Sequence, residues 1–452
     1  MHSNKTRDIL VASLTLFAMF LGAGNLIFPP YVGAQAGQGW LIACLGFLMT
    51  GVGLPLLGTL TIAKLDGDPN RLFENGWMWM GRALNMLILL AIGPLFAIPR
   101  TAATTCELSV LPFLSDSVNQ QTVFIMVCSL FFIITYLLSV SESKVMDAIG
   151  GILAPVLVVF LIITIILSIV RPIGKPQASV VEGSIFYYGF SSGYQTMDGI
   201  GSLVMSGAIA ALVAQRGYQK KEAKGILRIC AVVAGLLLAM VYGGYTWIGA
   251  SGSGALRGFT ERTAMLSHAS MLIGGHIGKI MLAAIIFFAC ITTASGLTVT
   301  FAQYFCRLFK NKLSYKVWVL ICVGFSFFIS LIGVEGIIKL SVPVLEIIYP
   351  LCIVVILLHQ AERFIFSRGS FKGAVVASLL YCLILALGHF SATQSINEAI
   401  LDFLPLGKDG FGYLLPSAMG FAIGSTLERF NKQQGQEQSP SSQTKGEGKA
   451  LV

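Results

Sequence analysis

Long apolar runs are the feature of this sequence that most restricts its fold. Twelve such runs follow one another, and short loops that carry most of the charged residues separate them. An α-helix rises about 1.5 Å per residue, so roughly 20 residues cross the hydrocarbon core of a bilayer. Because lipid offers no partners for backbone polar groups, such runs cross membranes as helices. We therefore predict an all-α membrane protein with about twelve transmembrane helices.

The predicted spans form a single polytopic domain over residues 1–430. They lie at residues 8–31, 39–64, 82–108, 121–140, 145–170, 184–214, 226–250, 276–308, 315–334, 337–359, 372–390 and 411–429. Residues 431–452 are rich in Gln, Ser, Lys and Gly, a composition typical of disordered segments. We predict a disordered tail there.

Composition supports membrane embedding and excludes several function classes. Apolar residues make up 55% of the chain and charged residues 11%, against about 25% charged residues in soluble domains. The net charge of +9 is spread over the loops, so we expect no nucleic-acid partner. The nine Cys and five His lack metal-binding spacing, and no obligate protein partner is evident. The expected partners are the lipid bilayer and a small molecule.

The basic residues are unequally divided between the two sides that twelve spans define. With both termini on one side, 22 of the 30 Lys and Arg residues lie on that side. Cytoplasmic loops carry an excess of Lys and Arg. We therefore predict a multi-pass protein of the bacterial inner cell membrane whose N and C termini are cytoplasmic.

Two of the predicted spans contain interruptions. The first contains Gly22-Ala23-Gly24-Asn25, and the sixth contains SSGYQTMDGIG at residues 191–201. Each glycine weakens a helix by about 1 kcal/mol relative to alanine. Polar, non-helical backbone in a membrane is tolerated only where it is buried in protein or lines a cavity. We predict that helices 1 and 6 are broken beside an interior cavity.

The positions of the two breaks predict an inverted repeat. The first break opens a set of five spans, and the second opens the next five. Because five is odd, the second set enters the membrane from the opposite side. We expect a 5+5 inverted repeat over about 8–170 and 184–359, with extra helices at about 372–429. Paired interruptions of this kind point to the binding site of a secondary transporter.

The broken helices offer groups for both poles of an amino acid. A half-helix that begins near Gly24 presents N–H groups to a carboxylate, and one that ends near Ser191 presents carbonyls to an ammonium group or a cation. Small and apolar neighbours suit an aliphatic side chain. The predicted substrate-binding residues of the two breaks are Gly22, Ala23, Gly24, Asn25, Ser191, Gly193, Tyr194 and Thr196.

A cation site is predicted beside the first break. Thr292 and Thr293 place two hydroxyls on one span, next to carbonyls that the broken first helix frees. Hard oxygen ligands suit alkali and alkaline-earth cations. The alternative is that these hydroxyls bond back to their own helix or to a neighbouring one.

At these residues the sequence resembles the BrnQ-type branched-chain amino acid:cation symporters. The matching stretches are FLGAGNLIFPP at 20–30, GPLFAIPRTA at 93–102 and GYQTMD at 193–198. The resemblance covers the membrane portion almost end to end. It implies a LeuT-like fold, Na⁺ coupling, and leucine, isoleucine and valine as substrates.

The resemblance also implies ligands. Similarity to the LeuT-like sodium symporters implies that the carbonyls of Ala18 and Leu21 join the hydroxyls of Thr292 and Thr293 around Na⁺. Gly93 and Phe96 of the second matching stretch are expected at the substrate. Proton or Li⁺ coupling stays open, and no organic cofactor is expected.

Asp198 is the single residue that most strongly indicates a function, because a carboxylate at membrane depth is energetically costly. We expect it to coordinate a cation or relay a proton, and the alternative is a cap for the half-helix that follows. An H⁺-coupled symporter, a passive channel and a non-transporting amino-acid sensor remain alternatives. No catalytic constellation is visible, so an enzyme is not expected.

Arg100 is expected near the outer end of the third span, paired with a carboxylate such as Glu107 or reaching the interface.

Overall fold

The computed structural model describes residues 5–115, 118–141, 145, 147–361, 367–388, 400, 402–405, 407 and 411–437. Helices make up the fold, and no strand occurs among these residues. The helices of the first half are α1 (Lys5–Phe20), α2 (Ala23–Ala36), α3 (Trp40–Leu48), α4 (Leu54–Lys64), α5 (Met78–Leu90), α6 (Ala97–Ser109), α7 (Gln120–Ser139) and α9 (Ala154–Val170).

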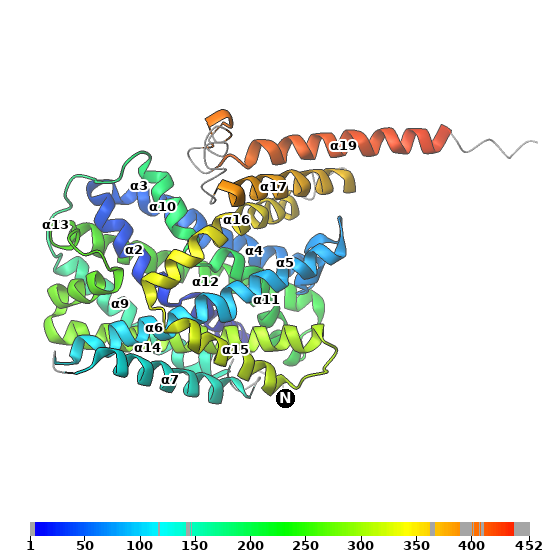
Figure 1. The fold of residues 1–452 in the computed structure, drawn as a ribbon. Coiled ribbons are helices and arrows are strands. Elements are labelled where there is room, and N and C mark those ends of the chain that lie inside the picture. The colour runs from blue at the N-terminus through cyan, green and yellow to red at the C-terminus, as the bar shows by residue number, and fades with distance from the viewer. Residues whose placement is uncertain are drawn as a thin grey trace, which may run out of the picture.

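The second half continues with helices of very different lengths. They are α10 (Ile185–Tyr194), α11 (Asp198–Gln215), α12 (Lys220–Ser251), α13 (Ser253–Leu256), α14 (Arg262–Leu308), α15 (Tyr315–Ser330), α16 (Val334–Gln360), α17 (Arg368–Gly388) and α19 (Leu414–Glu437). Figure 1 shows them as one bundle, with α17 and α19 together at its edge.

Each predicted span overlaps helix among the described residues, although the first and sixth are interrupted and residues 146, 389 and 390 lie outside the described part of the chain. Nine helices of the described part of the chain are long and apolar enough to cross a membrane, and Tyr315–Ser330 is a shorter apolar helix. The multi-pass, all-helical prediction is confirmed. The number of twelve crossings and the inverted relation of the two halves stay predictions.

Three predicted spans contain a π-helical turn. These turns are η2 (Met49–Gly53), η4 (Ala91–Leu95) and η6 (Ile149–Leu153), and each contains glycine and precedes or contains a proline. Proline cannot donate a backbone hydrogen bond, and glycine weakens the helix locally. Such turns are frequent at functional sites. In η4 the backbone of Gly93 leaves the helical region, so the third span is bent at its middle.

The outer surface of the bundle is apolar. Leu137, Leu236 and Phe328 each expose about two thirds of their area, at 66%, 67% and 69%. A water-soluble protein rarely exposes large contiguous apolar patches, whereas a lipid-facing surface requires them. This exposure identifies the outer faces of α7, α12 and α15 as lipid-facing.

Glycines bring α2 and α12 into backbone contact. A side chain at Gly33 would collide with the backbone of Thr246, and one at Gly249 would collide with the Pro30 carbonyl. Helices in membranes associate through such small residues, because close approach maximises van der Waals contact. This contact anchors the segment after the first break on the long helix α12.

The helices α17 and α19 pack together through glycines at the edge of the bundle (Figure 1). Gly369 and Gly373 on α17 face Gly420 and Gly424 on α19 across the contact. The helix α19 continues to Glu437, so the first residues of the tail predicted to be disordered are helical. Residues 438–452, the remainder of that tail, lie outside the described residues.

Candidate substrate and cation site

The first helix break lies at Leu21 and Gly22, between α1 and α2. Gly22 is extended, with φ −102° and ψ −164°, and its N–H donates to Asn25 Oδ1 at 3.2 Å. The Asn25 side chain therefore folds back over the start of α2. The first N–H groups of a helix have no partner within it, so the N-terminal end of α2 attracts negative charge.

The second break lies between Tyr194 and Asp198. Met197 adopts a left-handed backbone conformation with φ +64°, which is uncommon for a non-glycine residue. Thr196 supports the turn, because its hydroxyl donates to the Gly193 carbonyl at 2.9 Å and accepts from the Asp198 N–H at 3.4 Å. Strained backbone of this kind concentrates at binding sites and switch regions.

The two breaks meet at Asp198. Its Oδ2 accepts one hydrogen bond from Asn25 Nδ2 and one from the Tyr242 hydroxyl, both at 2.6 Å. Asn25 Nδ2 also contacts the Tyr242 hydroxyl directly. Asp198 is 2% exposed and Tyr242 is fully buried. Tyr242 on α12 is a site residue that the sequence did not reveal, since it lies in an apolar helix without any interruption.

A small cavity of about 20 Å³ lies beside this cluster. Its wall combines polar groups from both breaks with apolar groups from α1, η4, α6, α11 and α14. The lining residues are Met19, Phe20, Gly22, Ala23, Asn25, Ile92, Ala97, Arg100, Thr101, Thr196, Met197, Asp198, Met205, Thr293 and Leu297. Of the residues predicted from the sequence, this cavity brings together Gly22, Ala23, Asn25, Thr196, Asp198 and Thr293.

The other predicted residues of the sixth span lie away from this cavity. Ser191 donates its hydroxyl to the Tyr188 carbonyl of its own helix at 3.2 Å. Gly193 packs closely against Thr50 of η2. Tyr194 stacks on Tyr349, with ring centroids 4.2 Å apart. Their role in substrate binding stays a prediction.

Three further predicted residues pack just behind the cavity wall. A side chain at Gly24 would meet the Arg100 guanidinium, and one at Gly93 would meet the Phe301 ring at 3.2 Å. Phe96 is 8% exposed, and its carbonyl accepts the Arg100 N–H at 3.1 Å. Gly24 and Gly93 thus permit close packing at the bends of two helices.

Oxygen atoms of α1 and α14 meet next to the first break. Thr293 Oγ1 donates to the Ala18 carbonyl at 3.0 Å, and Thr292 Oγ1 lies 3.3 Å from the same carbonyl. Thr292 also bonds back to its own helix, at the carbonyls of Phe288 (2.9 Å) and Ala289 (3.0 Å). These hydrogen bonds, to the same helix and to neighbouring α1, are those of the alternative interpretation, and the cation site stays a prediction.

Leu21 lies in the gap between α1 and α2, where its N–H donates to the Phe17 carbonyl at 2.9 Å. No described contact joins its carbonyl to Thr292 or Thr293. No cluster of three or more His, Cys, Asp or Glu exists among the described residues. The donors gathered at Ala18, Thr292 and Thr293 are hard oxygens, which suit an alkali cation.

The expectation for Arg100 was wrong. Arg100 is 2% exposed, lines the cavity and makes no ion pair with Glu107. Glu107 instead accepts from Thr263 Oγ1 at 2.8 Å and from the Val334 N–H at 3.1 Å. The reason is the bend at η4, because α6 begins only at Ala97 and Arg100 lies in its first turn. A straight span over residues 82–108 would have carried Arg100 towards the membrane surface.

Aromatic and ionic contacts join α2, α14 and α16 at one end of the molecule. Arg262, at the start of α14, pairs with Glu335 at 2.5 Å. Its guanidinium lies over the rings of Phe28 (5.5 Å) and Tyr31 (4.6 Å). Arg100 lies 5.6 Å from the centroid of the same Phe28 ring. Phe28 therefore contacts both Arg262 and Arg100, and Arg100 lines the cavity.

The opposite end contains a larger cavity of about 750 Å³. Its wall includes Asp66, Arg82, Arg307 and Lys310, and it reaches inward to Val204 and Thr300. It approaches the small cavity to within one helical turn at three residue pairs, namely Leu89 and Ile92, Val204 and Met205, and Thr300 and Leu297. The two cavities therefore have lining residues close together on the same helices.

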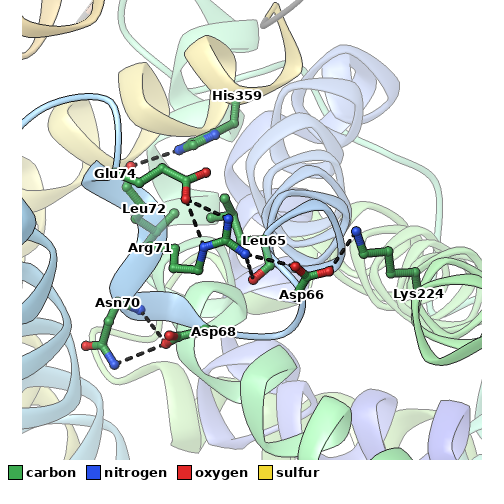
Figure 2. A network of polar contacts seen from close by, with 9 residues as sticks. All are labelled: Leu65, Asp66, Asp68, Asn70, Arg71, Leu72, Glu74, Lys224 and His359. Carbon is green, nitrogen blue, oxygen red and sulfur yellow. Dashed lines mark hydrogen bonds and ion pairs between the residues drawn. The ribbon is translucent and has the colours of Figure 1, made fainter. Parts of the chain in front are cut away.

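A polar network holds the loop at this end (Figure 2). Asp66 pairs with Lys224 of α12 at 2.7 Å and with Arg71 at 2.9 Å, and Arg71 also pairs with Glu74 at 2.7 Å. The hydrogen bond from Lys224 is the main reason that the pKa of Asp66 lies below its ordinary value. His359 contacts the Leu72 carbonyl at 2.8 Å. The network joins the loop to both α12 and α16.

Comparison with known proteins reveals relatives along almost the whole chain. Residues 5–431 match a family described as branched-chain amino acid transport protein. The chain is 36% identical to the branched-chain amino acid permease BraB of Bacillus subtilis over 95% of its length and 97% of the relative's. It is 35% identical to the branched-chain amino acid transport system 3 carrier protein of Pseudomonas aeruginosa, over 95% and 98% of the two chains.

Solved structures show the fold. A Na⁺-coupled sialic acid symporter superimposes with a TM-score of 0.59 at 14% identity, covering 93% of this chain and 89% of the other. The nucleobase-cation-symport-1 family transporter MHP1 gives 0.57 at 13% identity, covering 94% and 93%. These likenesses establish a LeuT-like fold.

Proposed function

Because this chain belongs to the family of branched-chain amino acid transport proteins, we propose that it imports leucine, isoleucine and valine together with Na⁺. The chain is a transporter and not an enzyme. The proposed mode is secondary active symport by alternating access, in the inner membrane of a bacterium with both termini cytoplasmic. The substrate would bind where the two broken helices meet.

The contact between Asn25 and Asp198 is the observation that carries the proposal. It joins the two interrupted helices by a 2.6 Å hydrogen bond, and the two residues are buried, with Asn25 1% and Asp198 2% exposed. Buried polar groups beside two helix ends form a site for a small zwitterion, since each helix end leaves backbone groups without partners. A simple pore has no need for paired breaks of this kind.

The substrate class is supported by the names of the relatives and by the cavity wall. Both relatives are named for branched-chain amino acids. Among the lining residues, Ile92, Met205 and Leu297 present apolar side chains that suit an aliphatic substrate. Their place opposite the polar breaks would orient the substrate with its charged end towards Asn25 and Asp198.

Sodium coupling is supported by the oxygens of Ala18, Thr292 and Thr293. Thr293 both bonds to the Ala18 carbonyl and lines the cavity, so a cation there would lie next to the substrate. Bound Na⁺ would fix α14 against α1 and hold the first break open for the amino acid. Coupling requires that Na⁺ bind better to the substrate-competent state, since only differential affinity shifts a conformational equilibrium.

Alternating access is supported by the unequal ends of the molecule. Arg262, Glu335 and Phe28 close one end, whereas the cavity of about 750 Å³ opens the other. We assign the open end to the cytoplasm, because the Lys and Arg residues concentrate on that side. The small cavity of about 20 Å³ is narrower than an amino acid requires, so substrate binding would widen it.

Proton coupling through Asp198 is the second candidate. The observation that favours it is a carboxylate that is 2% exposed in the middle of the site. Such a group is a natural proton carrier in a membrane protein. In that mechanism Asp198→Asn would abolish uphill uptake, and Na⁺ would have no effect.

Uptake of radiolabelled leucine into proteoliposomes of the purified protein tests the proposal. An inward Na⁺ gradient at fixed pH is expected to drive leucine above its outside concentration, and isoleucine and valine are expected to compete. Uptake driven only by a proton gradient would replace Na⁺ with H⁺. No uptake under either gradient would contradict the assignment of leucine and favour a sensor.

A further inference from the structure

Arg100 is a buried cation whose hydrogen-bonding capacity is largely unused. Its side chain is 2% exposed, and neither Nε nor Nη1 has a hydrogen-bond partner among the described residues. No ion pair joins it to any carboxylate of the described chain. A guanidinium stays charged at every physiological pH and carries five donors in a planar fork.

Such a group is costly to bury unless an anion meets it. Buried charges in proteins are paired, because removal from water without compensation costs several kcal/mol. The ring of Phe28, 5.6 Å from the guanidinium carbon, provides a weak cation–π contact only. The missing partner is therefore an anion that enters the site with the ligand.

The local packing directs the guanidinium to the helix breaks. A Cβ atom at Gly24 would lie 2.5 Å from Arg100 Nη2 and 3.1 Å from the Gln195 carbonyl. The missing side chain of Gly24 thus leaves room for the guanidinium between the first break and the second. In the same region the N-terminal end of α2 adds the positive end of a helix dipole.

Asp198 provides the opposite charge on the same cavity. Arg100 and Asp198 both line it, yet no ion pair connects them among the described contacts. The hydrogen bonds from Asn25 and Tyr242 end on Asp198 Oδ2 and fix its direction. A cavity with one fixed cation and one fixed anion that do not neutralise each other is complementary to a zwitterion.

We propose that Arg100 binds the α-carboxylate of the transported amino acid while Asp198 receives its α-ammonium group. The guanidinium and carboxylate form the bidentate pair that their planar geometries favour. The side chain of the substrate then contacts Ile92, Met205 and Leu297. This inference rests on the proposed function, and it adds the residue that selects amino acids over amines and over ligands without a carboxylate.

Competition binding to the purified protein in Na⁺ tests the carboxylate contact. Leucinol keeps the ammonium group and the side chain of leucine but replaces the carboxylate with a hydroxymethyl group. Removing one partner of a desolvated charge pair weakens binding substantially, so the wild type should bind leucine at least about 30-fold more tightly than leucinol. In Arg100→Gln, the ratio of the two affinities should fall at least about tenfold, mainly through weaker leucine binding.

Arg262→Gln is the matched control. Arg262 lies over the same Phe28 ring, but it is paired with Glu335 and does not line the cavity. Its loss should leave the leucine-to-leucinol ratio unchanged, even if both affinities shift. If Arg100→Gln does not reach the membrane, Arg100→Lys carries the test. Lysine keeps the positive charge but lacks the planar set of guanidinium donors, so the leucine-to-leucinol affinity ratio should fall by about tenfold.

Two results would overturn the inference. One is a wild-type protein that binds leucine and leucinol equally. The other is a leucine-to-leucinol ratio that changes less than tenfold in Arg100→Gln while leucine still binds. Failure of the proposed function has a different signature, namely wild-type protein that neither binds nor takes up leucine under any cation gradient.

Discussion

Asn25 and Asp198 are 173 residues apart in the sequence and are joined by a 2.6 Å hydrogen bond between the two broken helices. Tyr242 of α12 contacts both side chains, so three segments are fixed at one buried point. A rearrangement that separates α1 and α2 from α10 and α11 must break this contact. A rearrangement that preserves the contact must move both breaks together. The contact therefore connects the two broken helices at the proposed binding site.

Removal of the Tyr242 hydroxyl is expected to weaken leucine binding. A hydrogen bond to a charged group contributes about 1.5–3 kcal/mol, so Tyr242→Phe should lower leucine affinity about 10- to 100-fold. The matched control is Tyr245→Phe on the same helix, because the Tyr245 hydroxyl is buried and has no hydrogen-bond partner among the described residues. Binding of radiolabelled leucine to purified protein measures both. Equal effects of the two variants would contradict the role of Tyr242 at Asp198.

Removal of the Thr293 hydroxyl is expected to weaken the response to Na⁺. Thr293→Val keeps the shape of the side chain but deletes the oxygen that meets the Ala18 carbonyl. The Na⁺ concentration for half-maximal uptake should rise about tenfold or more. Thr298→Val serves as the control, because Thr298 is buried on the same helix and bonds back to Ala294. An unchanged Na⁺ dependence in Thr293→Val would remove this residue from the cation site.

A methyl group at Gly24 is expected to block the substrate site. In Gly24→Ala the new atom would lie 2.5 Å from Arg100 Nη2, so the guanidinium would have to move. Overpacking costs about 1–3 kcal/mol, and we expect leucine uptake to fall about tenfold or more at an unchanged amount of protein in the membrane. Gly243→Ala is the control, since a methyl group there would meet no atom of the described chain within 4 Å. Normal uptake by Gly24→Ala would show that this close approach is unimportant.

The loop network at Asp66 is expected to be insensitive to pH in the physiological range. The pKa of Asp66 is lowered, chiefly by the Lys224 hydrogen bond, so its charge stabilises the folded loop at neutral pH and is lost only as pH falls through that lowered pKa. Asp66→Asn should therefore change leucine uptake by the same factor from about pH 5.5 to pH 8. The measurement is the ratio of mutant to wild-type uptake across this range. A ratio that changes near neutral pH would make Asp66, and not Asp198, the candidate proton carrier.

The helical content and the two breaks were predictable because they depend on local chemistry. Runs of apolar residues long enough to span a bilayer leave no other fold, and Gly22, Gly24 and the polar run at 191–201 weaken a helix wherever it lies. The same local signals singled out Asn25, Thr196 and Asp198, which line one small cavity in the structure, and their role in binding stays a prediction. The additional helix over residues 262–274 was missed, because Gly275, with φ +59°, divides α14 into two parts of different direction.

The partners of the breaks were not predictable from the sequence, because they depend on how distant helices pack. Tyr242 lies in a continuous apolar helix, and nothing near it in the chain indicates that it faces Asp198. Arg100 was misplaced because the backbone leaves the helical region at Gly93 and α6 begins only at Ala97, and hydropathy does not show how the chain continues after such a bend. Leu21 was expected from the resemblance to sodium symporters and Ser191 from the free carbonyls at a helix end, and both stay predictions.

Sodium flux driven by leucine is the most direct test of the central claim, which is coupling at the joined breaks. Proteoliposomes with equal Na⁺ on both sides receive an inward leucine gradient, and entry of radioactive sodium is followed. Because coupling is reciprocal, we expect radioactive sodium to enter only when leucine is added, although Na⁺ is initially equal on both sides. This leucine-dependent sodium entry should be lost in Thr293→Val. Leucine entry without any accompanying sodium entry would contradict the account.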